Sequence, residues 1–386
     1  MFSKDSRFRQ RTLSRFDSRT RKFVRILERR IKFFLSSPLG ALLRPRRGKT
    51  PVSPEQVSGI LILRYDALGD AVLTTPVWRT LKRLAPHIRI GVAGSRRNKM
   101  LLEADPDIDN VFIFSKDLSA PLLKELSRAR KIKWDFVLNL YFHDKTRAAI
   151  FSKIVAPQGL SVTIVREKKE KYLDLYSVVG DRPPLPAPMV EQNIQVLKET
   201  IDLPIEPEDL RPSLPEYPEI RASFQPHLDT ILQSSESFDY FIINTDASQI
   251  YKEWGIRNSL ALARKMRNAW PRRHIFLSSA PERAPAVRDA LRPVESGITY
   301  LETPSILHLA VAVRGARAVI SPDTSVIHFA TAQNVPVVGL YMEPNEFLPY
   351  RSANRVLYAP EGQTAAAISV NDVFEALCDL LHETGP

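Results

Sequence analysis

One stretch decides the fold of this chain: Gly59-Ile-Leu-Ile-Leu-Arg64, followed by Tyr65-Asp-Ala-Leu-Gly69 and then by Asp70-Ala-Val-Leu-Thr-Thr-Pro76. A continuous apolar run of this length is typical of a parallel strand that is buried on both faces. Apolar residues at helical spacing come after the polar turn, which predicts a helix from Asp70 to about Leu84. We therefore expect the folded part of the chain to begin with a strand, a tight loop and a helix.

The same alternation recurs in two series along the chain. Proline-rich segments at 181–188 and 204–226 separate the two series. Repeated βα units predict an α/β fold, so we expect two doubly wound Rossmann-like domains that face each other across a cleft. The expected strands are 59–64, 88–93, 110–114, 135–140 and 161–165 in the first series and 239–244, 274–278, 298–301, 316–320 and 336–341 in the second, with helices at 191–200, 259–269 and 305–314.

These segments also predict the domain organisation. In doubly wound sheets, ligands bind beyond the carboxyl ends of the strands. We therefore look for chemistry in the loops that follow residues 64, 244 and 320. The predicted parts are a basic arm and hinge at 1–56, an N-terminal domain at 57–190, a helix and proline-rich linker at 191–237, a C-terminal domain at 238–345 and a C-terminal segment at 346–386.

The positive charge of the chain is concentrated in its first fifty residues. The net charge is +12, but residues 1–50 hold 16 basic and 3 acidic side chains, which leaves 39 basic and 40 acidic side chains elsewhere. A folded body this close to neutral argues against a nucleic-acid-binding surface on it. The single cysteine, Cys378, excludes an internal disulfide and a cysteine-ligated zinc site. No apolar run reaches the ~20 residues that span a bilayer.

The arm has the pattern of a basic amphipathic helix. Such a helix can lie in a membrane interface with its cations near anionic headgroups. A solvated tail, a mitochondrial transit peptide at 1–32 and a nucleic-acid-binding arm are the alternatives. The apolar positions, at spacings of three, four or seven, are Leu13, Phe16, Phe23, Leu27, Ile31 and Phe34.

Three loops carry side chains suited to catalysis or ligand binding. Asp70 suits a general base, although Asp is also a favoured helix cap. Lys252 suits a diphosphate as a point charge, although a lone loop lysine is usually solvated. In the segment 321–328 a strand runs directly into a helix, whose free N–H groups suit a phosphate but are equally well capped. The residues singled out in that segment are Asp323, Thr324, Ser325 and His328, the last at i+4 from Thr324.

Four motifs in this order resemble one known family. They are Leu68-Gly69-Asp70 with Thr75-Pro76, Lys252-Glu-Trp254, Pro322-Asp323-Thr324 with His328, and Val335-Pro336-Val337. The succession, within residues 58–345, resembles that of glycosyltransferase family 9, the heptosyltransferases of lipopolysaccharide core assembly and their relatives. The resemblance implies a GT-B architecture, with an acceptor-binding N-terminal domain, a donor-binding C-terminal domain and a final helix that packs back toward the first domain.

The resemblance also implies roles for individual residues. Asp70 matches the catalytic base, and Lys252 matches the lysine that holds the phosphates of the donor. The donor-site loop is matched at Asp323, Thr324 and His328 and includes Ser325. Gly69, Thr245 and Trp254 are expected to support the site. The family requires no metal and no cofactor, and its co-substrate is a nucleotide-diphosphate sugar, which implies ADP-heptose here.

The function that follows is inverting, metal-independent transfer of a sugar, namely heptose, to a lipopolysaccharide core or related cell-envelope glycan. The expected partners are the nucleotide sugar, a lipid-linked or lipopolysaccharide-core acceptor and an anionic membrane surface that residues 1–50 contact. The expected location is the cytoplasmic side of the bacterial plasma membrane, as a peripheral protein. The alternatives are a non-catalytic nucleotide-sugar-binding or scaffolding protein at the membrane and, through the arm, a nucleic-acid-binding protein.

Some residues depart from the family pattern. Ser321 and Ser325 stand where relatives usually have Gly, Gly255 where a Pro commonly follows the Trp, and Asn334 where Gly is usual. A Cβ at Ser325 could obstruct close approach to a pyrophosphate. The segment Asp105-Pro-Asp107-Ile-Asp109 contains overlapping Asp-x-Asp pairs, which hold a divalent cation in another glycosyltransferase architecture. We interpret them as turn and cap residues.

Overall fold

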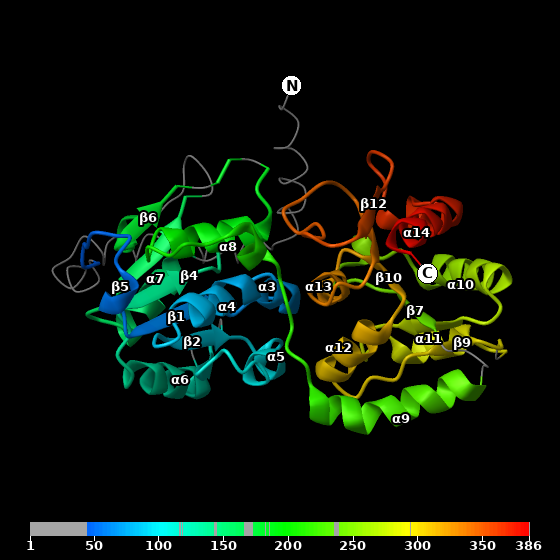
Figure 1. Cartoon of the computed structure of the whole chain (residues 1–386), viewed down its shortest axis with the longest axis horizontal. Coiled ribbons are helices and arrows are strands. Elements are labelled where there is room, and N and C mark those ends of the chain that lie inside the picture. Colours follow the sequence, from blue (N-terminus) through cyan, green and yellow to red (C-terminus); the bar gives the residue numbers. More distant parts are fainter. Residues whose placement is uncertain are drawn as a thin grey trace, which may run out of the picture. The chain divides into compact units, whose positions relative to one another are not determined.

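The structure, a computed structural model, contains two parallel β-sheets of six strands each in the residues that it describes (Figure 1). Those residues are 45–115, 117, 119–142, 145–165, 173–181, 183–184, 186–234, 239–293 and 295–385. The N-terminal arm up to residue 44, where the amphipathic helix was predicted, lies outside them. Residues 47–386 belong to one unit of the structure, which the following paragraphs describe.

The first sheet has the strand order β3-β2-β1-β4-β5-β6. Its strands are β1 (Gly59–Arg64), β2 (Arg89–Gly94), β3 (Asn110–Ile113), β4 (Phe136–Asn139), β5 (Leu160–Ile164) and β6 (Val178–Gly180). The second sheet has the order β12-β11-β10-β7-β8-β9, which is the same winding repeated. Its strands are β7 (Tyr240–Asn244), β8 (His274–Ser278), β9 (Ile298–Tyr300), β10 (Ala318–Pro322), β11 (Val337–Tyr341) and β12 (Asn354–Tyr358).

Helices connect the strands of both sheets. Those of the first half are α3 (Leu68–Val72), α4 (Thr75–Leu84), α5 (Lys99–Glu103), α6 (Ala120–Arg130), α7 (Lys145–Val155) and α8 (Met189–Lys198), and α9 (Pro218–Ser234) follows them. Those of the second half are α10 (Ile256–Ala269), α11 (Ala284–Ala290), α12 (Ile306–Gly315), α13 (Ser325–Ala332) and α14 (Val370–Thr384). This architecture confirms the predicted α/β fold with two doubly wound sheets.

The two central strands are buried on both faces, as their apolar sequences predicted. Alternate residues of a strand point to opposite faces of its sheet. Ile60 and Ile62 of β1 therefore pack with the side chains of α4 and α8, whereas Leu61 and Leu63 pack with those of α6 and α7. In the second sheet, Ile242 of β7 likewise belongs to the cluster that contains α12 and α13, while its neighbours pack with α10 and α14.

The predicted helix from Asp70 to Leu84 is wrong in one respect, because the segment forms two helices, α3 and α4. Pro76 has no N–H with which to continue the hydrogen-bond ladder of α3. The Oγ1 of Thr75 donates a hydrogen bond to the Val72 carbonyl instead (2.8 Å). The break places Asp70 in a five-residue helix directly after β1.

The proline-rich region between the two sheets contains more structure than the sequence predicted. Helix α8 packs on β4 and β5 of the first sheet, and α9 packs on α12 of the second half. Helix α9 was missed because Pro218 and Pro226 both lie in it. Its apolar side is nevertheless buried at Phe224, Leu228 and Leu232.

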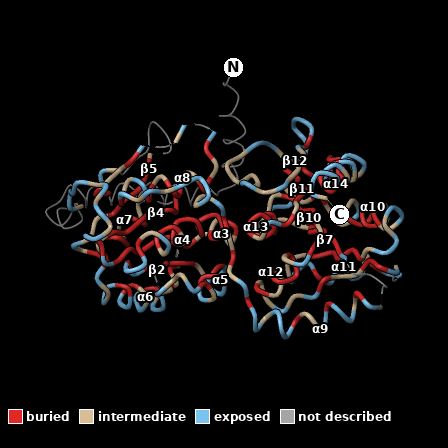
Figure 2. Tube along the Cα trace, in the orientation of Figure 1, coloured by how far each residue is buried: buried red, intermediate tan, exposed pale blue. Residues whose placement is uncertain are grey.

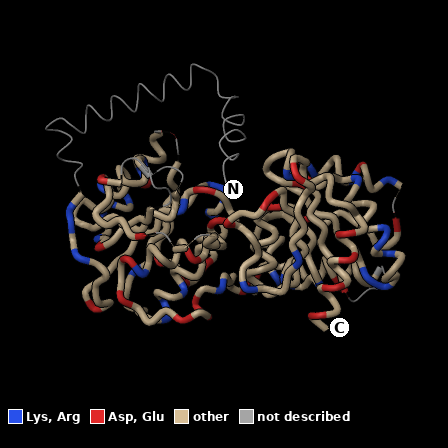
Figure 3. Tube along the Cα trace, turned by 90° about the horizontal axis from the view of Figure 1, so that it is seen from above, with Lys and Arg blue, Asp and Glu red and all other residues tan. Residues whose placement is uncertain are grey.

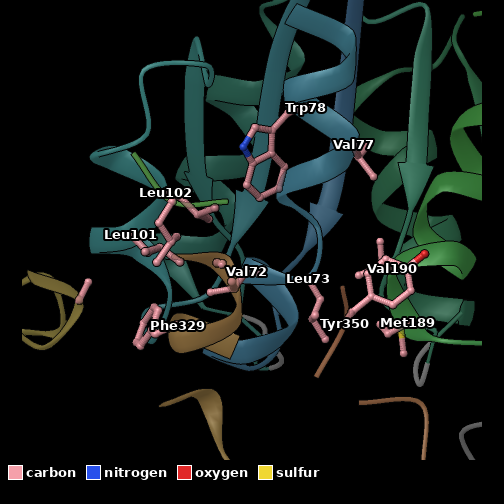
Figure 4. Close-up of a cluster of buried hydrophobic side chains, with 14 of the residues drawn as sticks. Val72, Leu73, Val77, Trp78, Leu101, Leu102, Met189, Val190, Phe329 and Tyr350 are labelled. Carbon is pink, nitrogen blue, oxygen red and sulfur yellow. The ribbon is translucent and has the colours of Figure 1, made fainter. Parts of the chain in front are cut away.

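One apolar cluster is continuous between the helices of the two sheets. Helix α3 packs on α13, and Figure 2 shows buried residues along both helices where they meet. Figure 4 shows Phe329 of α13 beside Leu101 of α5, and Tyr350 beside Val190 of α8. This contact brings the loop after β1 close to the loop after β10.

The C-terminal segment packs in two places. The N–H of Met189 in α8 donates to the Glu346 carbonyl (2.8 Å), and the Tyr350 hydroxyl donates to Glu191 (3.0 Å). The final helix α14 packs on α10, β11 and β12 of the second half, whereas the resemblance implied a final helix that packs back toward the first domain. Within the described residues, none of the helices has the length and apolar composition needed to cross a bilayer.

The charges of the folded body are mixed. Figure 3 shows acidic and basic residues interspersed along the described part of the chain, in keeping with the near-neutral composition of this part. Two contacts fix the first residues of the folded body. Arg47 donates a hydrogen bond to the Tyr176 carbonyl (3.2 Å), and Val52 forms a β-bridge with Ile201. These contacts show that the folded body begins before residue 57, within the segment predicted as a hinge.

Candidate functional site

The candidate site residues follow the strands at which each sheet reverses its winding. In the first sheet the order reverses between β1 and β4, and in the second between β7 and β10. Ligands of doubly wound sheets bind at this point, beyond the carboxyl ends of the strands. Asp70 follows β1, Lys252 follows β7, and Asp323 and His328 follow β10. The topology therefore brings each predicted site residue to the position where this fold binds ligands.

Asp70 is the third residue of α3 and is not its cap. The N-cap position is held by Ala67, which makes no side-chain cap bond. The Asp70 carboxylate is 16% exposed, and its Oδ1 lies 3.8 Å from Nη1 of Arg64. This carboxylate is partly accessible, lies in the first turn of a helix and is paired with a cation, so it suits the role of a general base.

The Arg64 side chain organises the loop that carries Asp70. It is 1% exposed, and its Nη1 donates to Oδ2 of Asp66 (2.8 Å). Its Nε donates to Oγ1 of Thr74 (2.8 Å) and its Nη2 to Oδ1 of Asn193 in α8 (2.8 Å). Thr74 in turn donates to the main-chain carbonyl of Asp70 (2.8 Å). Sequence reasoning assigned no role to Arg64, although a charged residue that ends a buried apolar run is itself a signal.

On the second sheet, Lys252 and Asp323 form an ion pair. Lys252 ends the short 3-10 helix η5 (Ile250–Lys252), and its Nζ lies 2.6 Å from Oδ2 of Asp323. The two side chains are 30% and 11% exposed, and the amide of Asn345 also reaches the Asp323 carboxylate (3.5 Å). The Lys252 ammonium therefore lies at the N-terminal end of α13, where a helix attracts anions.

The helix cap of α13 is Thr324, not Asp323. The hydroxyl of Thr324 accepts a hydrogen bond from the Val326 N–H (3.3 Å), so the capping alternative for this segment is confirmed at Thr324 and not at Asp323. Behind it, Asn244 at the end of β7 donates to the hydroxyls of Ser321 and Thr324 (3.2 Å each). This network joins the ends of β7 and β10 and leaves the Asp323 carboxylate to pair with Lys252.

The departure from Gly at Ser321 has a structural explanation. The side chain of Ser321 is buried, and its hydroxyl lies 3.0 Å from that of Thr324 and donates to the Pro322 carbonyl (2.8 Å). The added hydroxyl therefore joins the network beneath the loop. Ser325, by contrast, is half-buried in the first turn of α13, and its Cα would lie 3.4 Å from a Cβ added to Gly69.

His328 lies at the contact between α13 and α3. It is 4% exposed, and burial lowers its pKa to about 4, so the ring is neutral near pH 7. A Cβ added to Gly69 would lie 2.7 Å from Cδ2 of this ring. Gly69 therefore supports the site through its lack of a side chain, because only such a residue lets α3 and α13 approach each other this closely.

The two other supporting residues, Thr245 and Trp254, are buried. The Oγ1 of Thr245 donates to the Ser278 carbonyl (3.2 Å), which ties the end of β7 to β8. The indole of Trp254 donates to the Ile368 carbonyl (2.9 Å) and anchors the residues after η5. Both side chains are buried and bind main-chain carbonyls, so they can hold in place the segment that carries Lys252.

Two further departures from the family pattern occur where the backbone has a positive φ. Gly255, at the start of α10, has φ 91°, which proline cannot adopt because its ring fixes φ near −65°. Asn334, after α13, has φ 60°, in the left-handed region that Asn tolerates better than most residues. The loop after Trp254 therefore follows a different path from the one that a proline would impose.

The carboxylates of the Asp-x-Asp segment form ion pairs with basic side chains of the same protein. Asp105 and Asp107 lie 3.6 Å and 3.1 Å from the guanidinium of Arg79, and Asp109 lies 2.8 Å from Nζ of Lys82. Asp105 also accepts a hydrogen bond from the indole of Trp78 (3.0 Å). In the part of the chain that the structure describes, no group of three His, Cys, Asp or Glu side chains is placed to hold a metal ion.

Known proteins resemble this chain in sequence pattern and in fold. The family model of glycosyltransferase family 9 (heptosyltransferase) matches residues 123–376, which include the loops after β7 and β10. No curated protein sequence gives a significant match. Among solved structures, the glycosyl transferase family 9 protein from Veillonella parvula DSM 2008 matches with a TM-score of 0.72 and 20% identity, over 87% of this chain and 100% of that chain.

Two structures from E. coli are also similar. The heptosyltransferase WaaC with ADP matches with a TM-score of 0.64 and 17% identity, over 84% of this chain and 100% of that chain. The ADP-heptose lps heptosyltransferase II matches with a TM-score of 0.64 and 18% identity, over 84% and 99%. These likenesses show that the fold is GT-B. Since the family model covers more than half of the sequence, the chain belongs to glycosyltransferase family 9.

Proposed function

We propose that this protein is an inverting glycosyltransferase that moves a heptose from a nucleotide-diphosphate donor to a hydroxyl of a lipopolysaccharide core or related cell-envelope glycan. The observation that carries the proposal is the contact between α3 and α13. This contact brings Asp70, suited to take a proton, near Asp323 and its partner Lys252, suited to hold a diphosphate. A transfer reaction needs both functions close to one sugar carbon.

In the proposed reaction, Asp70 accepts the proton of the acceptor hydroxyl while that oxygen attacks the anomeric carbon of the donor. The bond between this carbon and the phosphate oxygen breaks on the opposite side, which inverts the configuration. The nucleoside diphosphate leaves as an anion and therefore needs positive charge more than it needs a proton. Lys252 and the N-terminus of α13 supply that charge as donors that are already in place, and the reaction as proposed uses no metal ion.

Adenosine diphosphate is the nucleotide that we propose for the donor. Two of the structures similar to this chain are those of E. coli WaaC with ADP and with ADP-2-deoxy-2-fluoro heptose. The roles of Asp323 and His328 follow from their positions. The Asp323 carboxylate, paired with Lys252, is neutralised where a phosphate would otherwise be repelled, and the neutral ring of His328 adds no charge at the contact between the helices.

The proposal is tested with a panel of nucleotides and nucleotide sugars. Binding of ADP, UDP and GDP is measured by calorimetry, and nucleotide release from the matching sugar donors is then followed with a lipid-extract acceptor. We expect ADP to bind best and ADP-heptose to be consumed only when acceptor is present. Binding without turnover would favour a non-catalytic nucleotide-sugar-binding protein, and equal, weak binding of all three nucleotides would contradict the proposed donor.

We also propose that residues 1–50 hold the protein at the cytoplasmic face of the bacterial plasma membrane. The support is the excess of 13 positive charges in these residues and their apolar positions at helical spacing. Each cation near an anionic bilayer contributes about 1 kcal/mol of attraction. An enzyme whose acceptor is anchored in a lipid layer gains from staying at that surface.

A further inference from the structure

One buried cation faces both Asp70 and a second carboxylate, and the proposed reaction has not used it. Arg64 is 1% exposed, so its charge requires partners inside the protein. Its Nη1 is 2.8 Å from Oδ2 of Asp66, which is a hydrogen bond, and 3.8 Å from Oδ1 of Asp70, which is beyond hydrogen-bond distance. The two carboxylates therefore interact with the same guanidinium in different ways.

Hydrogen bonds fix the Arg64 guanidinium in the position from which it binds Asp66 and does not bind Asp70. Its Nε is bound to Thr74 and its Nη2 to Asn193, both at 2.8 Å. The amide of Asn193 donates to the Leu73 carbonyl (3.0 Å) and to Thr74 (3.3 Å), so the same side chain also fixes the end of α3. With three of its nitrogens engaged, Arg64 cannot swing toward Asp70 without losing a buried hydrogen bond.

We infer that Arg64 and Asp66 are positioning residues for Asp70, with Asp66 holding the guanidinium away from hydrogen-bonding Asp70 while its charge still acts on that carboxylate. The inference rests on the proposed function, in which Asp70 accepts the proton. A base has to be ionised before the reaction and still be basic enough to take a proton. The charge of Arg64 favours the ionised form, and the charge of Asp66 offsets much of that effect.

Among the described residues, other titratable groups also lie near α3. His328, on the packed helix α13, is neutral near pH 7. Lys252 and Asp323, at the start of α13, form an ion pair with each other. Helix α8 contributes the uncharged amide of Asn193, and its Glu191 is hydrogen-bonded to Tyr350. Arg64 and Asp66 therefore act in opposite directions on the pH at which Asp70 gains its proton.

The test is a double-mutant cycle of the two charged residues in the full-length protein, with two independent pH titrations of each variant. The variants are Asp66→Asn, Arg64→Gln and the double variant. The first reading is the acidic limb of the pH profile of kcat/KM. The second is the 13C titration of the Asp70 carboxyl in protein labelled at aspartate, assigned by its absence in Asp70→Asn, which needs no turnover.

Asp66→Asn removes a negative charge near Asp70 and so stabilises the ionised form of Asp70. The midpoints of the kcat/KM profile and of the 13C titration should both move to lower pH by about 1 unit. Arg64→Gln removes the positive charge and moves both midpoints to higher pH by at least about 1 unit. The double variant returns them to within about half a unit of wild type. If Arg64→Gln does not fold, the Asp66→Asn shift and the charge-balanced double variant still decide the matter.

The matched control is Asp105→Asn, which changes another buried aspartate of the first half, between α5 and β3, that lies near an arginine. It should leave both midpoints in place, whereas a purely structural effect would lower activity in every variant without opposite shifts. Unchanged midpoints in Asp66→Asn would overturn the inference. Full activity in Asp70→Asn would instead overturn the base role, and the titration would still report whether Arg64 and Asp66 act on Asp70.

Discussion

At the scale of single residues, the donor side of the site depends on one ion pair. Lys252 and Asp323 lie 71 positions apart in the sequence, so no local spacing could predict their contact. The side-chain type and its place after β7 did predict that Lys252 would carry the site's positive charge. The structure shows in addition that the Asp323 carboxylate holds the Lys252 ammonium at the start of α13.

Replacing Lys252 by Ala should weaken ADP binding about 10- to 100-fold, because a hydrogen bond to a charged group contributes about 1.5–3 kcal/mol. The Kd is measured by calorimetry. The Lys252→Ala/Asp323→Asn double variant should recover part of the loss, since it also removes the unpaired carboxylate. Lys265→Ala, on the exposed side of α10, is the matched control. An unchanged Kd in Lys252→Ala would show that this lysine does not meet the donor.

Two buried histidines should make stability depend on pH. Burial lowers the pKa of His274 and of His328 from 6.5 to about 4. The unfolded chain therefore binds more protons than the folded one between these values, so the free energy of unfolding should fall as the pH decreases from 6.5 towards 4. Each histidine contributes up to about 3 kcal/mol. Urea titrations over this range should flatten in His274→Gln and in His328→Gln, and an unflattened curve in both would contradict their neutral burial.

At the scale of elements, the apolar strands were predictable and the irregular ones were not. The runs at 59–64 and 239–244 are continuous and apolar, so strands β1 and β7 appear within a residue of their predicted bounds. Strand β12 was missed because its residues are only partly buried and begin with Asn354 and Arg355. Strand β6 has three residues, too few for a periodic pattern.

The contacts of the site residues could likewise not be predicted from local sequence patterns. The sequence places Asp70 at the end of a buried strand, which predicts its position but not its neighbours. Arg64 meets Asn193 across 129 positions, and Gly69 meets His328 across two different sheets. Such contacts arise from the packing of α3 on α13 and of α4 on α8, which no local pattern in one sequence determines.

The contact between α3 and α13 can be tested at Gly69. Alanine favours helices, so Gly69→Ala should destabilise the protein only through its Cβ, which would lie 2.7 Å from the ring of His328. We expect a loss of about 1–3 kcal/mol, measured by urea unfolding. The cost should shrink when His328→Ala is already present. An equal cost in both backgrounds would mean that the two helices are not in this contact in solution.

At the scale of the whole molecule, the charge of the chain and its proposed chemistry belong to different parts. The folded body is close to neutral, and the excess charge precedes it. Because Arg47 donates to the Tyr176 carbonyl, a cut after Arg46 keeps the contacts of the body, whereas a cut after residue 50 would remove them. A chain that begins at Arg47 therefore keeps the contact of Arg47 with Tyr176.

The chain that begins at Arg47 should lose its binding to vesicles of anionic lipid and should keep transfer to a soluble acceptor. Co-sedimentation with anionic and neutral vesicles measures the first effect, and nucleotide release measures the second. Binding of the full chain should weaken as the salt concentration rises, because surface charges are screened. If the shortened chain binds anionic vesicles as well as the full one, the arm is not a membrane anchor.

The central claim is that Asp70 is the base of a sugar transfer between the two sheets. The most direct measurement is the turnover of Asp70→Asn with ADP-heptose and acceptor, beside its Kd for ADP. The substitution keeps the shape of the side chain and removes its ability to take a proton. We predict a loss of at least ~100-fold in kcat with unchanged ADP binding. Turnover near that of wild type would contradict the account.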